Sequence, residues 1–251
     1  IGLREAAKPA LKTWAMEDTR DRIIGQFGAI NGVLYVDADE AQKDAWLADN
    51  ADRVLFGAAK GNNTTNDHSA ALLTVDATTD VLKKGSLSLL KRMARTASPK
   101  IRPLQNKGNG KKLYVAYAHP YSFRDLRSEM ESILDDTTAQ GEALRLFEGG
   151  DLYWDGIIIK ELEDMPIYQN VGNGGIDVAP VYLIGAQAVG YGTAKRWKSI
   201  DKKFDWDDKA GVALEAIDGF AKLTFGTGAG DRDNLKDYGI ATGFFAAVDD
   251  A

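Results

Sequence analysis

The 251-residue sequence contains no cysteine, only two histidines and no apolar run long enough to cross a bilayer. Without cysteine there are no disulfides, no thiol nucleophiles and no thiolate ligands for a metal. A membrane-spanning helix needs roughly 18 consecutive apolar residues. A signal peptide needs a shorter apolar run behind basic residues, and the sequence has neither feature. We therefore expect no membrane partner and no cysteine chemistry.

Nucleotide and catalytic signatures are also missing. No GxxxxGK(S/T) phosphate loop occurs, and glycine turns account for the glycine clusters at 190–192 and 226–230. His119 directly follows an expected strand, where a histidine is more often a hydrogen-bonded structural residue than a general base. No nucleophile can be combined with a base and an orienting group. We therefore expect no catalytic residue, no metal ligand and no cofactor.

Acidic residues between positions 151 and 164 leave one enzymatic alternative open. Paired carboxylates carry out glycoside hydrolysis when one acts as acid and the other as base or nucleophile. Acids on a hairpin more commonly mark a solvated strand edge, because edge charges prevent unwanted pairing. A carboxylate-dependent hydrolase therefore stays as the alternative from a different functional class.

Charge is distributed unevenly along the chain. The net charge is −6, yet the segment from Lys83 to Lys112 contains ten basic residues and no acid. The remaining chain therefore has 21 basic and 37 acidic residues. This segregation favours an acidic partner for the basic segment, either nucleic acid or an acidic surface of another copy. A solvated helix face followed by a loop explains the same pattern equally well.

Two sets of residues are candidates for such contacts. The candidate inter-subunit or DNA-facing basic residues are Lys84, Lys91, Arg92, Arg95, Lys100 and Arg102. The candidate acidic partners on a neighbouring copy are Asp151, Asp155, Asp205, Asp207 and Asp208. Aromatic residues are not interleaved with the basic ones, which argues against a groove that stacks single-stranded bases.

Hydrophobic periodicity predicts a long amphipathic helix from Asp76 to Ser98, which could serve as a spine for other elements. Asp76 or Thr78 is the expected cap, and Pro99 the expected stop. A central strand at 113–118 and a helix beginning with a Ser122/Asp125 capping box should follow.

The rest of the chain predicts further helices and several short strands. Helices are expected at 3–27, 39–56 and 142–147, and strands at 29–36, 152–163 (a hairpin turning at Asp155-Gly156), 181–189, within 210–225, and 238–248. Segments 60–69, 169–176 and 227–234 read as loops. With 44% hydrophobic residues the chain can bury a core, and helices followed by a strand-rich half indicate an α+β protein.

The order of these segments resembles a known family. After the basic helix come LYVAYAHPYSFRDLRSEM, EGGDLYWDGIIIKELEDMP, APVYLIGAQAVGYGTAKRW and DYGIATGFFAAVDD. This series resembles the major capsid proteins of tailed bacteriophages with the Hong Kong 97-like fold, in the branch typified by the podovirus N-four. The likeness covers most of residues 70–250. No single motif is decisive, but the ordered set is specific.

The resemblance implies a division of the chain. Residues 1–103 would form a peripheral domain with the N-terminal helices and the spine helix. Residues 104–235 would form a mixed α/β axial domain, and 236–251 would return to the peripheral domain. The N-terminal arm and extended loop of the family are not found in the sequence. We expect them upstream, either cleaved or absent from this chain.

The resemblance also implies a function. Many copies would assemble as hexamers and pentamers of an icosahedral virion capsid around double-stranded DNA, helped by a scaffolding protein and a portal, in the host cytoplasm. The expected role is structural rather than enzymatic. A bacterial encapsulin, a nanocompartment shell that holds an enzyme cargo, is the nearest alternative.

Overall fold

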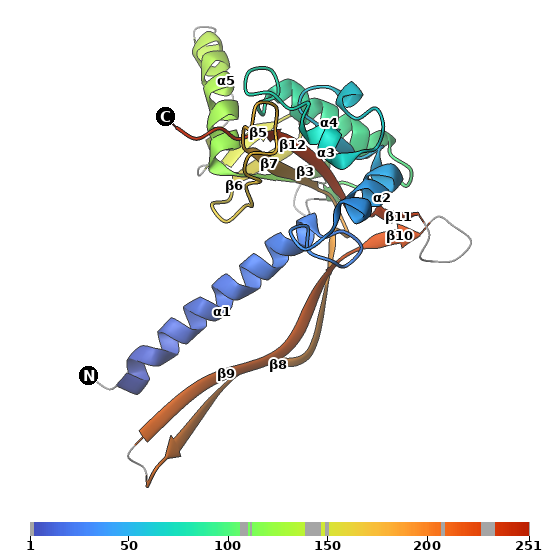
Figure 1. Ribbon diagram of the computed structural model, residues 1–251. Helices are drawn as coiled ribbons and strands as arrows, with labels where there is room; N and C mark the ends of the chain where they lie inside the picture. Colours follow the sequence, from blue (N-terminus) through green and yellow to red (C-terminus); the bar gives the residue numbers. More distant parts are fainter. Residues whose placement is uncertain are drawn as a thin grey trace.

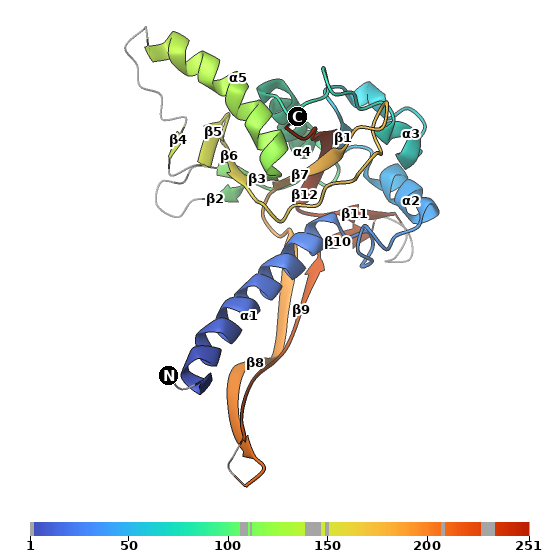
Figure 2. The same cartoon turned by 60° about the vertical axis from the view of Figure 1, so that its left-hand side comes forward.

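In the computed structural model a mixed sheet with helices on both faces forms a body, from which one long helix and one long hairpin project (Figure 1, Figure 2). The structure describes residues 3–105, 110, 112–138, 147–148, 151–206, 209–226 and 234–250. Its helices are α1 (Leu3–Gly28), α2 (Glu40–Asn50), the short 3₁₀ helix η1 (Lys60–Asn62), α3 (His68–Leu72), α4 (Lys84–Thr96) and α5 (Pro120–Thr138).

β3 (Lys112–Ala118) lies in the middle of the body sheet, as its apolar sequence predicts. The strand order is β1-β12-β7-β3-β6-β5-β4, and β2 (Leu104–Gln105) pairs beside this path with β3. Its other strands are β1 (Val54–Phe56), β4 (Phe147–Glu148), β5 (Asp151–Trp154), β6 (Ile157–Glu161), β7 (Val178–Ile184) and β12 (Ile240–Ala246). The β1–β12 and β3–β6 pairs are parallel and the others antiparallel. The mixed sheet and its helices confirm the α+β class.

Alternate residues of β12 point to opposite faces of this sheet, and each face has its own core. Phe245 packs with Leu90 of α4 and Phe123 of α5. Phe244 packs with Trp46 of α2 and Leu72 of α3. Because successive side chains of a strand alternate, a run such as β12 with every residue buried must be covered on both faces.

Two further hairpins lie outside the body sheet. β8 (Val189–Phe204) and β9 (Lys209–Lys222) form one long antiparallel pair. The short strands β10 (Thr224–Gly226) and β11 (Leu235–Asp237) form the other. Two register shifts interrupt the β8–β9 ladder, and the hairpin curves along its length (Figure 1). Bulges of this kind bend a strand and increase its twist.

The predicted helix over 76–98 is wrong at its start, because α4 begins only at Lys84. The Asp76 carboxylate accepts hydrogen bonds from the backbone N–H groups of Thr78 and Thr79, so it forms a local turn instead of a cap. Val81 forms a parallel bridge with Ala246, which requires extended backbone just before the helix. α4 therefore has 13 residues, and α1 with 26 is the longest helix of the described chain.

α5 also starts differently from the prediction. Pro120 is its first residue, where a missing N–H costs nothing. The backbone N–H of Tyr121 donates to Nδ1 of His119 at 3.2 Å. The buried Ser122 lies inside the first turn, and its hydroxyl has no partner among the described residues, so the Ser122/Asp125 capping box is not formed. His119 has the structural role that the sequence favoured.

Other boundaries are partly confirmed. α1, the Asp155-Gly156 turn with positive φ at both residues, and β12 agree with expectation. The expected helix 39–56 ends at Asn50 and is followed by β1, and 29–36 contains one isolated bridge instead of a strand. The expected helix 142–147 and the loop 227–234 lie almost wholly outside the described residues, and Phe147 belongs to β4.

The body sheet joins strands from all three ranges of the expected domain division: β1 from 1–103, β3, β6 and β7 from 104–235, and β12 from 236–251. The peripheral and axial roles of these ranges stay a prediction. Within the described residues, no helix is both long enough and apolar enough to cross a membrane.

Candidate assembly surfaces

α1 and the β8–β9 hairpin form a projection that we call the arm; the remaining elements are the body (Figure 1, Figure 2). The last turn of α1 anchors the arm to the body. Phe27 stacks on Tyr117 of β3 with ring centroids 5.7 Å apart, and Ile24 packs in the same cluster as Tyr182 and Ile184 of β7. The arm therefore begins at the sheet, and its far end extends into solvent.

Ion pairs hold α1 against the hairpin. Arg22 lies 2.8 Å from the carboxylate of Asp218 on β9, and its guanidinium also lies 5.1 Å from the ring centre of Phe220. The Asp218 side chain is buried, and its hydrogen bond raises the pKa of Arg22. Nearer the end of the arm, Lys8 pairs with Asp201 of β8 at 3.0 Å. The helix is thus fixed to both strands.

A groove of about 730 Å³ runs between α1 and the hairpin. Its wall is almost wholly apolar, and its charged lining residues, Lys12 and Arg20, are both cations. The other lining residues are Ala15, Met16, Thr19, Ile23, Ile24, Phe27, Tyr117, Leu162, Tyr191, Trp197 and Leu214. An open apolar groove of this size on a protein surface is typical of an interaction site.

The arm also exposes large apolar side chains outside the groove. Trp14 is 54% exposed, Ile217 61%, and Trp206, at the end of the arm, is fully exposed. Single exposed apolar residues are ordinary, but their concentration on one thin projection is not. The surface of the arm therefore has the character of an interface.

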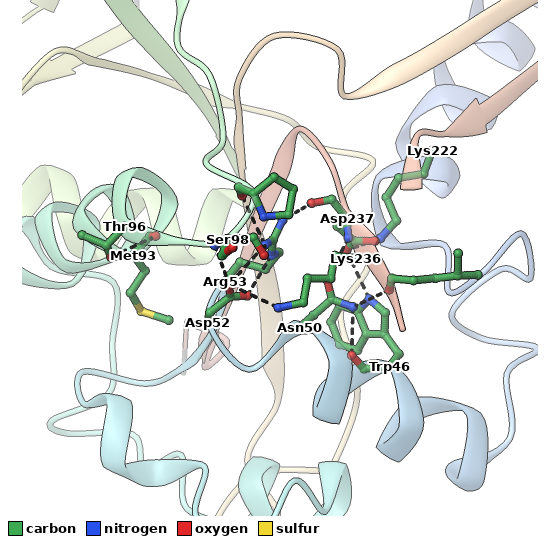
Figure 3. A network of polar contacts seen from close by, with 12 residues as sticks. Trp46, Asn50, Asp52, Arg53, Met93, Thr96, Ser98, Lys222, Lys236 and Asp237 are labelled. Atoms are coloured by element: carbon green, nitrogen blue, oxygen red, sulfur yellow. Dashed lines mark hydrogen bonds and ion pairs between the residues drawn. The ribbon is translucent and has the colours of Figure 1, made fainter. Parts of the chain in front are cut away.

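Figure 3 shows a buried polar network where the base of the β8–β9 hairpin meets the body. The Asp237 carboxylate of β11 accepts hydrogen bonds from Nζ of Lys222 at 2.8 Å and from Nε1 of Trp46 at 3.1 Å. The Asp237 backbone N–H donates to the Asn50 side chain at 2.8 Å. Because Lys222 is the last residue of β9, this buried ion pair joins the base of the arm to β11, and the hydrogen bonds of Trp46 and Asn50 join β11 to α2.

Arg53 extends the network toward α4 (Figure 3). Its side chain is fully buried and donates to the Asp52 carboxylate at 2.9 Å, to the backbone oxygen of Ser98 at 3.0 Å, and to that of Asp237. A buried charge is tolerated only when it is paired and hydrogen-bonded in this way. The residues from α2, the segment after α4, and β11 are therefore held as one unit.

The structure divides the candidate basic residues into two groups. Lys91 lies 2.8 Å from the Asp155 carboxylate, and Lys84 lies 3.7 Å from Glu129, so both lie in ion pairs within the chain. The others are exposed and make no ion pair with any described residue; they are Arg92, Arg95, Lys100 and Arg102. The charge pattern that predicted contacts between copies is therefore partly satisfied inside one copy.

The candidate acidic residues are similarly divided. Asp155 pairs with Lys91, and Asp151 pairs with Lys160 at 2.6 Å. Asp205 lies at the end of the arm, whereas Asp207 and Asp208 lie outside the described residues. The two carboxylates of the hairpin are thus neutralised by lysines, which favours the solvated-edge interpretation over an acid/base pair. Contact with a neighbouring copy stays a prediction for both sets.

His68 lies in an aromatic cluster of the body. Its ring packs against Phe56, Phe244 and Trp46, and the Tyr35 hydroxyl lies 3.2 Å from Nε2. Burial lowers the pKa of His68 to about 4, so the ring is neutral near neutral pH.

Three carboxylates gather beside His68, from Glu40, Asp44 and Asp67. Asp67 accepts from the backbone N–H of Ala70, Asp44 from that of His68, and Glu40 from that of Ser69. Each carboxylate therefore satisfies a backbone donor in the first turn of α3 or at its start. Hydrogen bonding accounts for the cluster without a metal.

Sequence reasoning missed the arm groove and the junction network. Leu214, Asp218 and Phe220 alternate along the face of β9 that meets α1, but the bulges and exposed aromatics of β8 hide the period-two signal. The aromatic composition of 193–208 was the available sign. The network joins residues that are 191 and 187 positions apart, and no local pattern indicates such a pairing.

A sheet body bearing an apolar, projecting arm defines a subunit shaped for association with other molecules. The sequence pattern of the phage capsid protein family matches residues 1–247, so the chain belongs to that family. The major capsid protein of Pseudomonas phage KPP25 is 29% identical over 197 residues, which cover 74% of this chain and 49% of that protein. The chain thus spans about half the length of this curated relative.

Solved capsid structures share the fold. The capsid of cyanophage Pam1 contains a chain that is 27% identical, with a TM-score of 0.85 over 100% of this chain and 70% of that chain. The capsid of Ralstonia phage GP4 gives a TM-score of 0.69 at 18% identity, over 99% and 68%. The head of Helicobacter pylori bacteriophage KHP40 gives 0.63 at 16%, over 98% and 69%. The last two similarities concern the fold alone.

Proposed function

We propose that this chain is a major capsid subunit, of which many copies form the hexamers and pentamers of an icosahedral virion shell around double-stranded DNA. The observation that carries this proposal is the likeness to the Pam1 capsid chain over the whole of the described fold, arm included. The same proposal includes the Hong Kong 97-like fold. It also includes assembly in the host cytoplasm with a scaffolding protein and a portal.

The role is structural, without catalysis. Membership of a capsid family supports this, and so do the carboxylates of the β5–β6 hairpin. Asp151 and Asp155 are each paired with a lysine, which is the arrangement of a solvated strand edge.

The size of the assembled species tests the proposal directly. Purified chain, with and without a scaffolding protein, is examined by light scattering and negative-stain imaging. Closed particles of megadalton mass are expected. A chain that stays a monomer or small oligomer under both conditions overturns the proposal, and particles that contain a protein cargo in place of DNA favour the encapsulin alternative.

The exposed basic residues Arg92, Arg95, Lys100 and Arg102 lie on or just after α4. Two partners fit them: acidic residues of a neighbouring copy, or the phosphates of the packaged DNA. Both partners are anionic, so the charge of the surface does not decide between them.

The double substitution Arg92→Glu and Arg95→Glu separates these partners. If the residues contact a neighbouring copy, closed particles should fail to form while the monomer stays folded. If they face DNA, particles should form with about the normal yield and package less DNA, and DNA binding by the unaltered chain should fall steeply with salt. The control, Lys60→Glu with Arg127→Glu, changes net charge equally at two other exposed sites, and it also removes the surface ion pair of Arg127 with Glu131. Normal particles with normal DNA content from the Arg92/Arg95 variant contradict both alternatives.

A further inference from the structure

Trp206 has no contact that explains its presence. It lies two residues beyond Phe204, the last residue of β8, and is fully exposed, with positive φ at both Asp205 and Trp206. No ring contact or hydrogen bond to it is found among the described residues. A buried tryptophan removes roughly 150–250 Å² of surface from water, which makes this side chain a strong anchor for any partner that covers it.

The groove between α1 and the hairpin has the apolar lining that a tryptophan side chain requires. Its walls are apolar, it is open to solvent, and its volume of about 730 Å³ exceeds that of one aromatic side chain. Met16 lies on its edge with 65% of its surface exposed, and Trp197 contributes a further aromatic wall. Flexible methionine beside aromatic rings is a common lining for a site that accepts a large apolar group.

Charge agrees with this pairing. The charged residues that line the groove are the cations Lys12 and Arg20, and Lys12 makes no ion pair within the described chain. Trp206 stands between Asp205 and Asp207 in the sequence. An indole flanked by acids therefore fits an apolar groove with a basic edge.

Trp206 does not reach the groove of its own chain. β8 ends and β9 begins at the end of the arm away from the body (Figure 1, Figure 2). The groove lies between α1 and the hairpin and reaches Tyr117 and Leu162 of the body. Trp206 therefore does not fill the groove of its own chain, whereas Trp206 of a second copy has the apolar character and the flanking charge that match the groove lining.

We infer that Trp206 at the end of one arm inserts into the α1–hairpin groove of a neighbouring copy. This inference rests on the proposed function, because it requires many copies to assemble. The contact joins two different surfaces, so each copy provides Trp206 for one contact and its groove for another. Such head-to-tail contacts form closed rings when the rotation between copies permits.

A photo-crosslinking amino acid at position 206 tests the insertion. p-Benzoylphenylalanine keeps an aromatic ring there, and the particles are irradiated after assembly. The expected products are covalent dimers whose crosslinks, mapped by mass spectrometry, fall on Met16, Ile23, Trp197 or other groove residues of a second copy. Crosslinks elsewhere, within one chain, or absent from intact particles overturn the inference while leaving the proposed function standing. If the unsubstituted chain forms no particles, the proposed function fails and the inference fails with it.

Substitutions on both sides of the contact provide a second test. Trp206→Ser should lower particle yield about tenfold, as loss of an interface anchor does, whereas Trp206→Phe should keep most of it. In the groove, Met16→Glu and Met16→Lys remove the same apolar surface at an exposed helical site. The glutamate should impair assembly more than the lysine, because it faces the acids beside Trp206. Unchanged yields, in variants whose melting temperatures match the unsubstituted chain, contradict the insertion.

Discussion

The body and the arm use the same residue types in opposite ways. Leu90, Phe244 and Phe245 of the body are buried between sheet and helices, whereas Trp14, Phe204 and Trp206 of the arm are half or fully exposed. A two-stranded hairpin alone is marginally stable in water, and here one helix covers only part of it. The body therefore buries its large apolar side chains within itself, and the arm is a surface that neighbouring molecules are expected to cover.

Charges show the same contrast. At the junction, Lys222 and Asp237 are both buried and their ion pair is shielded from solvent. On the arm, Lys8 and Asp201 form their ion pair with substantial exposure of the lysine. Buried pairs are costly to break, whereas exposed pairs contribute little. The attachment of the arm to the body thus depends on the buried pair at its base, whereas the ion pairs of Arg22 and Lys8 join α1 to the hairpin within the arm.

The largest expected change in the free energy of unfolding comes from a substitution in the core of the body. Phe245→Ala should lower the free energy of unfolding by about 3–5 kcal/mol, because it removes a fully buried ring and leaves a cavity between β12 and α4. Urea denaturation of the unassembled chain, followed by circular dichroism, measures this loss.

The matched arm variant is Phe204→Ala, in which the same ring is lost from a half-exposed position. Its free energy of unfolding should change by less than about 1 kcal/mol. Equal losses in the two variants would mean that the arm is as well packed as the body, which contradicts the contrast drawn between them.

A somewhat smaller effect is expected at the junction. Lys222→Met leaves the Asp237 carboxylate buried without its cation, although the Trp46 donor remains, and should cost about 3–4 kcal/mol. Adding Asp237→Asn to this variant removes the unpaired charge and should recover much of the loss. Lys8→Met is the control on the arm, and it should cost less than about 1 kcal/mol. The measurement is again urea denaturation, and a double variant no more stable than Lys222→Met would show that the ion pair is not the cause.

The sequence predicted the body better than the arm, for physical reasons. β3, β12 and the Asp155-Gly156 turn depend on local apolar runs and turn residues, so their patterns are readable along the chain. The start of α4 depends on the distant bridge between Val81 and Ala246, which overrides local helix propensity. Tertiary contacts decided this boundary.

The candidate surfaces were predicted only in part. The uneven distribution of charge along the chain indicated the exposed arginines of α4, but it could not show that Lys91 has its partner Asp155 within the same chain. The sequence did not indicate the groove of the arm. Its apolar residues come from α1 and from two strands in which bulges interrupt the alternation of side chains between the two faces. An interface that a neighbouring molecule covers leaves apolar residues exposed in the single chain. The positions of these residues do not repeat with the period of a buried helix or strand face, so hydrophobic periodicity does not indicate the interface.

The smallest of these effects concerns pH, and it acts on the body alone because both histidines, His68 and His119, lie there. Burial holds the pKa of His68 at about 4, below its ordinary value of 6.5. In the unfolded chain His68 takes up a proton below about pH 6.5, whereas in the folded chain it stays neutral until about pH 4. The unfolded state thus binds more protons in this window. Stability should therefore fall as the pH drops from about 6.5 to about 4, by at most about 3 kcal/mol, and this contribution should level off below pH 4.

Comparison with His68→Gln isolates this contribution from that of the carboxylates, because glutamine does not titrate and can still bond to the Tyr35 hydroxyl. The unfolding free energies of both chains are measured from pH 7 to pH 4. The difference between them should change steadily through the window in favour of the glutamine variant as the pH falls. A difference that stays constant would mean that His68 takes up its proton at the same pH in the folded and the unfolded chain. The body, like the arm, would then be open to its surroundings at this position, and the contrast between the two regions would not extend to the His68 cluster.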